Sequence, residues 1–125
     1  IKKIFNAKKN NIKYIEAWGT GKARREFLYV DDLVEALILA MQNYNSSEPV
    51  NIGTGTTISI KSLIELICKI LNYKGKIIWN NSKPDGQLKR QLNVQKSKLE
   101  FDFSAKTKLE EGLRKTIEWY INHEV

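Results

Sequence analysis

One apolar segment constrains the fold of this chain more than any other feature. Residues 33–41 read Leu-Val-Glu-Ala-Leu-Ile-Leu-Ala-Met, so eight of nine positions are apolar. A helix that is apolar nearly all round is buried on more than one side. A chain of 125 residues has little material with which to cover such a helix twice. Any fold proposed for the chain has to explain what covers this segment.

Apolar spacing and turn residues divide the chain into alternating helices and strands. The expected helices are 1–10, 33–43, 60–71 and 109–121, and the expected strands are 14–18, 26–30, 50–53 and 76–79. The strand over 26–30 can pair with the strand over 14–18. The order predicts one small mixed α/β unit over residues 1–125.

Three helix starts carry capping signals. Asp32 and Glu35 have the spacing of a capping box, and so do Thr107 and Glu110. Ser59 precedes the apolar stripe of the helix over 60–71 and can cap it. These residues predict helices that begin directly after Asp32, Ser59 and Thr107.

Composition excludes several classes of protein. Cys68 and His123 are the only cysteine and the only histidine, which excludes an internal disulfide framework and a multi-cysteine metal site. No apolar run approaches the ~18–20 residues of a membrane span. The sequence begins on Ile1 without a signal-peptide pattern. We therefore expect a cytoplasmic protein that does not enter a membrane, with Cys68 in the core and His123 on the surface.

Two groups of basic residues contribute to the net charge of +7. The first group is Lys22, Arg24 and Arg25, and the second is Lys83, Lys89, Arg90, Lys96 and Lys98. Each group is either a solvated face or a surface for phosphate or nucleic acid. Both lie in loops that contain Gly or Pro, which suits a compact anion better than a nucleic acid.

A small basic RNA- or DNA-binding module remains an alternative. Its aromatic platform would consist of Tyr14, Trp18, Phe27 and Tyr29. Such a module predicts an affinity that falls steeply as salt is added.

A glycine-rich turn separates Trp18 from Arg25. Trp offers an apolar face to a sugar or a base, and Arg offers a planar fork to a phosphate. The alternative is a hairpin with Trp18 in the core. Gly53-Thr54-Gly55 is either a weak phosphate-loop signal or a plain strand-to-helix turn. It lacks the third glycine of a dinucleotide-binding fingerprint and the lysine of a P-loop.

A second loop carries Lys83-Pro84-Asp85-Gly86. Asp85 can cap this turn or accept hydrogen bonds from a ribose or a base. Lys89 and Arg90 follow closely and can face the same anion as Arg25.

These segments together resemble a known family. They are Trp18-Gly-Thr-Gly, Arg25-Glu-Phe-Leu-Tyr-Val-Asp-Asp, Asn51-Ile-Gly-Thr-Gly, Ser82-Lys-Pro-Asp-Gly and Leu109-x-x-Gly-Leu. The series resembles the extended short-chain dehydrogenase/reductase family of nucleotide-sugar enzymes, over about residues 10–122. The resemblance implies the C-terminal, substrate-binding portion of such an enzyme, with a small mixed sheet and helices but without the main Rossmann domain.

The resemblance implies that the catalytic and cofactor-binding residues precede this chain. None of the five tyrosines is followed four positions later by a lysine, as the family's catalytic Tyr-x-x-x-Lys requires. NADP would be bound by the N-terminal Rossmann domain, and no cofactor is expected on this chain alone. The parent enzyme would epimerise a GDP-4-keto sugar at two ring carbons and then reduce its keto group, while the fragment itself would be inactive.

The resemblance also implies the site residues and the partners. Trp18, Arg25, Lys83, Asp85 and Arg90 correspond to substrate-binding positions for a GDP-sugar. The helix over 33–43 and the strand over 50–53 would pack on the Rossmann domain, which accounts for the apolar helix. The full-length protein would be a homodimer.

Some positions depart from the family pattern. Asn93 and Phe101-Asp102-Phe103 replace more usual residues, which weakens the substrate assignment more than the family. The same portion of a sugar-nucleotide 4-epimerase or 4,6-dehydratase remains an alternative.

Overall fold

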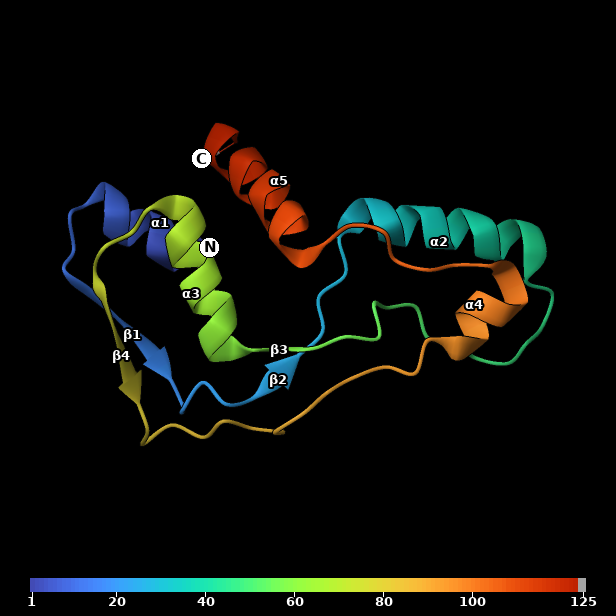
Figure 1. Cartoon of the computed structure of the whole chain (residues 1–125), viewed down its shortest axis with the longest axis horizontal. Helices are drawn as coiled ribbons and strands as arrows, with labels where there is room; N and C mark the ends of the chain where they lie inside the picture. Colours follow the sequence, from blue (N-terminus) through green and yellow to red (C-terminus); the bar gives the residue numbers. More distant parts are fainter. Residues whose placement is uncertain (124–125) are drawn as a thin grey trace.

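The computed structural model describes residues 1–123. Its elements are α1 (Lys2–Lys9), β1 (Tyr14–Trp18), β2 (Arg24–Arg25), α2 (Val30–Asn43), β3 (Ile58–Ser59), α3 (Ile60–Leu71), β4 (Lys76–Asn80), α4 (Gln95–Phe101) and α5 (Leu109–Asn122). Figure 1 shows α1, α3, β1 and β4 at one end of the molecule and α2 with α4 at the other. The short strands β2 and β3 lie between these two ends. The mixed α/β class predicted from the sequence is confirmed.

The strands form two small two-stranded sheets. β1 and β4 run parallel, from the pair Tyr14 and Lys76 to the pair Trp18 and Asn80. β2 and β3 are antiparallel, with Arg24 opposite Ser59. The strands predicted over 14–18 and 76–79 are confirmed.

Two predicted strands are wrong. The segment 26–30 has no strand structure, and the strand beside it is β2, which pairs with β3 instead of β1. Residues 50–53 also form no strand. A strand needs a neighbour to receive its backbone hydrogen bonds, and neither segment has such a neighbour among residues 1–123.

Ser59 caps α3 as predicted, because its Oγ accepts a hydrogen bond of 3.0 Å from the backbone N–H of Ser62. The two predicted capping boxes are wrong. α2 begins at Val30, before Asp32, and the N-cap of α5 is Lys108.

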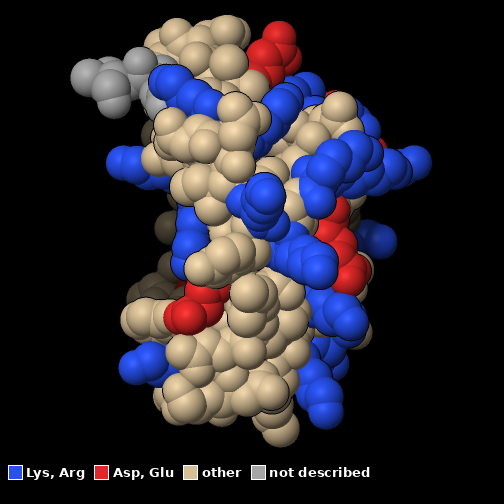
Figure 2. Space-filling view, turned by 90° about the vertical axis from the view of Figure 1, so that its left-hand side faces the viewer, with Lys and Arg blue, Asp and Glu red and all other residues tan. Residues whose placement is uncertain are grey.

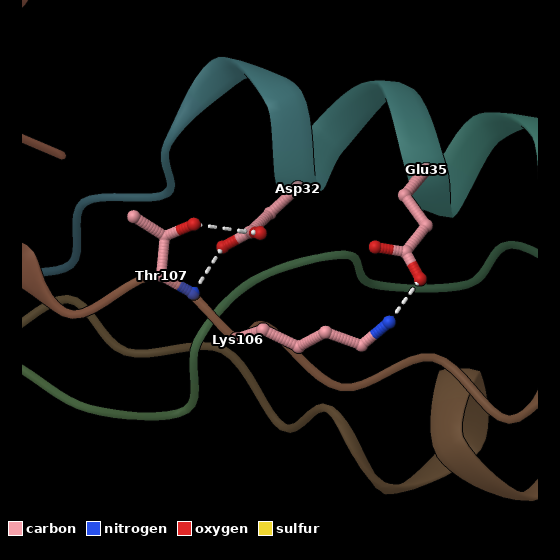
Figure 3. A network of polar contacts seen from close by, with 4 residues as sticks. All are labelled: Asp32, Glu35, Lys106 and Thr107. Atoms are coloured by element: carbon pink, nitrogen blue, oxygen red, sulfur yellow. Dashed lines mark hydrogen bonds and ion pairs between the residues drawn. The ribbon is translucent and has the colours of Figure 1, made fainter. Parts of the chain in front are cut away.

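The first residues of these two boxes, Asp32 and Thr107, bind each other instead (Figure 3). The buried carboxylate of Asp32 accepts hydrogen bonds of 3.0 Å from both the backbone N–H and the hydroxyl of Thr107. Next to this pair, Glu35 forms an ion pair with Lys106. Two signals that look local in the sequence are therefore halves of one contact between α2 and the segment before α5.

The larger core lies at the end that holds α1, α3 and β1. Its buried residues are Ile4, Ala7, Ile15, Ile67, Leu71, Tyr73 and Ile117. Cys68 packs against this core and is half-buried, close to the prediction. His123 is exposed, as predicted. α3 ends at Leu71, where Asn72 adopts a left-handed conformation.

The smaller core joins α2 to α4. It consists of Ala36, Phe101 and Phe103 with a surround of partly buried residues. The other apolar side chains of α2 are left exposed, namely Val30, Leu33, Val34, Leu37, Ile38 and Met41. Within residues 1–123, the apolar helix is therefore covered on one side only. No helix in the same range combines the length and apolar character that a membrane crossing requires.

Candidate functional site

The carboxyl ends of β1 and β4 bring three of the predicted site residues together. Trp18 and Asn80 are the last pair of the parallel ladder. The N–H groups of Gly19 and Lys83 both donate to the carbonyl of Asn80, at 3.0 and 3.2 Å. The loops that follow the two strands are therefore held side by side, as expected for parallel strands that end at one edge.

Trp18 does not lie in the core, so the alternative of a hairpin with a core tryptophan is wrong. Its side chain is 68% exposed. The Nζ atom of Lys83 lies 5.5 Å from the ring centroid, a cation–π distance. The pair presents an aromatic face and a positive charge to solvent.

Asp85 holds the turn that follows Trp18. Its carboxylate accepts a hydrogen bond of 2.6 Å from the N–H of Thr20 and another from the Thr20 hydroxyl. These hydrogen bonds from the hydroxyl and the N–H hold the pKa of Asp85 below its usual value. Asp85 thus stabilises the turn 19–21, not the turn in which it stands.

Arg25 and Arg90 lie on neighbouring backbone segments. Arg24 donates through its N–H to the carbonyl of Leu88 at 2.7 Å and accepts from the N–H of Arg90 at 3.1 Å. This parallel bridge pairs Arg24 with Lys89. Arg25 and Arg90 each follow directly after a bridged residue, so they occupy neighbouring backbone positions on the two segments.

The guanidinium of Arg25 also fixes the second segment. Its Nη1 atom donates to the carbonyl oxygens of Arg24 and Gln87, both at 2.7 Å. One edge of the fork is used in this way, and the remaining N–H groups are available for an anion.

Glu26 is a site residue that the sequence did not indicate. Its carboxylate accepts from the N–H groups of Thr54, of Gly55 at 2.9 Å and of Leu92 at 3.0 Å. Burial raises the pKa of this carboxyl, but the three backbone hydrogen bonds outweigh it, so the pKa lies below its usual value. The sequence feature that could have indicated Glu26 is its position, as a charged residue between Arg25 and the apolar run that begins at Phe27.

A cavity of about 390 Å³ lies beside Arg25. Its walls include Phe27, the hydroxyl-bearing residues Thr54, Thr56 and Thr57, and the segment 105–109. Of the five predicted site residues, Arg25 alone belongs to these walls. The structure therefore gathers Trp18, Lys83 and Asp85 in one group and Arg25 with Arg90 in another, joined by the segment 85–92.

Comparison with known proteins shows which proteins this chain resembles. The model of the NAD dependent epimerase/dehydratase family matches residues 1–53. "Probable GDP-L-fucose synthase 1" of Oryza sativa subsp. japonica is 39% identical over 123 residues, which are 98% of this chain and 37% of the relative. The chain is thus similar over nearly its whole length to a protein named as a GDP-L-fucose synthase.

Two further relatives extend the comparison. GDP-L-colitose synthase of Yersinia pseudotuberculosis is 37% identical over 98% of this chain and 40% of its own length. A crystal structure of a GDP-L-fucose synthetase from Naegleria fowleri superposes with a TM-score of 0.90 at 27% identity, covering 98% of this chain and 37% of that one. The resemblance read from the motifs is confirmed, and the chain spans about two fifths of the length of these relatives.

The GDP-L-fucose synthase relatives include a structure of the Naegleria protein bound to NADP. In this chain, the Gly53-Thr54-Gly55 turn does not fit a dinucleotide phosphate, because Glu26 already accepts the N–H groups of Thr54 and Gly55. The phosphate-loop interpretation of that turn is therefore wrong. No step of the chemistry is assigned to NADP at these residues.

Basic residues are spread over the end of the molecule that holds α1, α3 and β1. Figure 2 shows Lys and Arg side chains scattered over this face, with acidic side chains and uncharged surface between them. A nucleic-acid surface concentrates its positive charge along one groove or helix. The scatter on this face does not match such a surface.

Proposed function

We propose that this chain is the nucleotide-sugar-binding portion of an NADP-dependent epimerase/reductase of the GDP-L-fucose synthase type. The whole enzyme would convert GDP-4-keto-6-deoxy-D-mannose to GDP-L-fucose, with NADPH as the source of hydride. The observation that carries the proposal is the backbone bridge that brings Arg25 and Arg90 to neighbouring positions on two segments far apart in the sequence. Identity of 39% over nearly the whole chain supports it.

The proposed residues bind and orient the substrate. Arg25 and Arg90 take the diphosphate, whose paired oxygens match guanidinium forks. Trp18 covers an apolar face of the nucleotide sugar, and Lys83 above its ring adds a positive charge. Asp85 stands at the edge of the same site. Catalytic acid, base and hydride chemistry are assigned to none of the residues of this chain.

The sugar is the less constrained part of the substrate. The relatives named for L-fucose and for L-colitose share the GDP prefix and match this chain at 39% and 37% identity. A sugar-nucleotide 4-epimerase or 4,6-dehydratase remains the second candidate, because Asn93 and Phe101-Asp102-Phe103 depart from the expected pattern. A preference for GDP over UDP would favour the first candidate.

The proposal also assigns a partner to the exposed face of α2. Six apolar side chains of this helix are exposed, while the relatives are more than twice as long as this chain. We place the dinucleotide-binding domain of the same enzyme on this face, and a homodimer and a cytoplasmic location complete the proposal. Burial of such a face is a strong driving force for docking.

Binding of GDP to an Arg25→Ala variant tests the site. We expect a loss on the order of 1.5–3 kcal/mol, as for a hydrogen bond to a charged group. Arg25→Lys should restore only part of the affinity, because lysine lacks the bidentate fork. Calorimetry measures the affinity, and thermal melting measures the stability of the same samples.

Arg114→Ala is the matched control, since Arg114 is an exposed residue of α5 that pairs with Glu110. It should leave GDP affinity unchanged. Unchanged affinity in Arg25→Ala together with a sharp fall in melting temperature would make Arg25 a structural residue and refute the site.

A further inference from the structure

Two Gly-Thr-Gly turns in this chain are built in the same way. In the first, residues 19–21, the N–H of Thr20 donates to the carboxylate of Asp85. In the second, residues 53–55, the N–H of Thr54 donates to the carboxylate of Glu26. Each carboxylate takes a second hydrogen bond from the same turn, from the Thr20 hydroxyl or from the Gly55 N–H.

The glycines of both turns serve the close approach of the carboxylate. A Cβ atom on Gly19 would lie 2.2 Å from Oδ1 of Asp85, and one on Gly53 would lie 2.2 Å from Oε1 of Glu26. No side chain fits at such distances. The small residues of these turns are therefore explained by a protein carboxylate, with no need for a ligand phosphate at either position.

The two carboxylates stand at opposite ends of one segment. Asp85 begins the segment 85–92, and the N–H of Leu92 at its other end donates to Glu26 at 3.0 Å. Between these ends, the carbonyl of Gln87 accepts from the Arg25 guanidinium, and the backbone at Leu88 and Arg90 bonds to Arg24. All these anchors belong to residues 20–26.

We infer that Glu26 and Asp85 are positioning residues that clamp the segment 85–92 at both ends against residues 20–26, and so place Arg90 beside Arg25. Neither carboxylate needs to touch the ligand. The statement that the positioned arginines bind a nucleotide diphosphate rests on the proposed function, whereas the clamp itself does not.

The chemistry explains why a carboxylate is needed at Glu26, whose partners are all backbone N–H groups. An ionised carboxylate presents acceptors on both oxygens, so it can receive N–H groups from two directions. An amide of the same shape replaces one oxygen by an NH₂ group, which faces another donor. Glu26→Gln should thus release either the turn 53–55 or the N–H of Leu92. At Asp85 an amide could still accept from the Thr20 N–H and donate to its hydroxyl, so Asp85→Ala, which removes both acceptors, is the variant that should release the turn 19–21.

Hydrogen exchange of backbone amides tests the clamp directly. In Glu26→Gln, we expect exchange at Thr54, Gly55 or Leu92 to accelerate about tenfold or more, the effect of losing a hydrogen bond to a charged group. In Asp85→Ala, the affected amide should be that of Thr20. Glu110→Gln, which removes an exposed carboxylate on α5, is the matched control and should leave these amides unchanged.

A double-mutant cycle with GDP as the probe tests the positioning role. Glu26→Gln and Arg90→Ala should each weaken GDP binding about tenfold, and the combination should bind no worse than Arg90→Ala alone, because coupled residues are not additive. Additive losses, about a hundredfold in the combination, would refute action through Arg90.

Asp85→Ala runs through the same cycle and keeps the test usable if Glu26→Gln folds poorly, because the neighbours of Asp85 in its loop, Pro84 and Gly86, are exposed. If the unaltered chain does not bind GDP, the proposed function is refuted. Hydrogen exchange then tests by itself whether Glu26 and Asp85 clamp the segment 85–92. Unchanged exchange at Thr20, Thr54, Gly55 and Leu92 in the two variants would overturn the inference itself.

Discussion

The helices α2 and α3 have similar apolar content and opposite environments. α3 buries Ile67 and Leu71 in a core to which α1, β1 and α5 also contribute. α2 buries only Asp32 and Ala36, and the side chains of Leu37 and Ile38 are each 50% exposed. Both helices are well formed, so apolar content by itself did not decide which one was covered.

The difference lies in where each helix keeps its apolar residues. The apolar residues of α3 recur at helical spacing along one stripe, with lysines and a glutamate on the other side. Those of α2 surround the helix, so a single layer of neighbours leaves six of the nine exposed. α3 is thus an amphipathic helix with one buried face, whereas most apolar side chains of α2 are exposed within residues 1–123.

The largest expected effect separates the two helices directly. Ile67→Ala should destabilise the chain by about 2–5 kcal/mol, because it opens a cavity in a packed core. Ile38→Ala, the same deletion on α2, should change the free energy of unfolding by only about 0.5 kcal/mol. Chemical denaturation of both variants measures the contrast.

A longer protein that carries the proposed dinucleotide-binding domain sharpens this test. There, Ile38→Ala should become as costly as Ile67→Ala, because the same side chain would be buried. Equal and small effects of Ile38→Ala in both forms would refute the proposed packing of α2.

The next effect concerns the contact that ties α2 to the segment before α5. Asp32→Ala removes the acceptor of two hydrogen bonds from Thr107 in a buried place, and should cost about 1–3 kcal/mol of stability. Glu35→Ala breaks only the exposed ion pair with Lys106, and should cost about 0–1 kcal/mol.

Denaturation of the two variants, with Thr107→Val as a third, checks this order. Thr107→Val removes the hydroxyl but keeps the N–H, so its cost should fall between the other two. If Glu35→Ala lost more stability than Asp32→Ala, the conclusion that Asp32 makes the stronger contact would be contradicted.

The smallest effect is the pH dependence at the junction between the two cores. The pKa of Glu26 is lowered in the folded chain, so the unfolded chain binds a proton more readily as the pH falls. The stability that this carboxylate contributes is therefore complete above its ordinary pKa, at about pH 4–5, and is lost as the pH falls through its folded value.

Thermal melting between neutral and acid pH measures this loss. Glu26→Gln should flatten part of the acid limb, while Glu111→Gln on the surface of α5 should leave its slope almost unchanged. The same acid slope in Glu26→Gln as in the unaltered chain would show that Glu26 contributes nothing to it.

Local signals in the sequence were reliable where the partner was also local. The cap at Ser59 lies three residues from the N–H that it accepts, and the parallel strands carry their own apolar pattern. The capping boxes at Asp32 and Thr107 were misread, because the same side chains can accept or donate across 75 positions of sequence. Spacing alone does not distinguish the two uses.

The sequence by itself determined the α/β class, the positions of the main helices and the motifs that make the chain similar to the GDP-L-fucose synthases. These depend on periodicity and on residue types, which are properties of short segments. Only the tertiary structure decided that Glu26 and Asp85 hold two distant turns, that Trp18 is exposed beneath Lys83, and that α2 is bare on one side. The physical reason is that a hydrogen bond or a buried face depends on which remote segment lies opposite, and residue spacing along the chain does not carry that information.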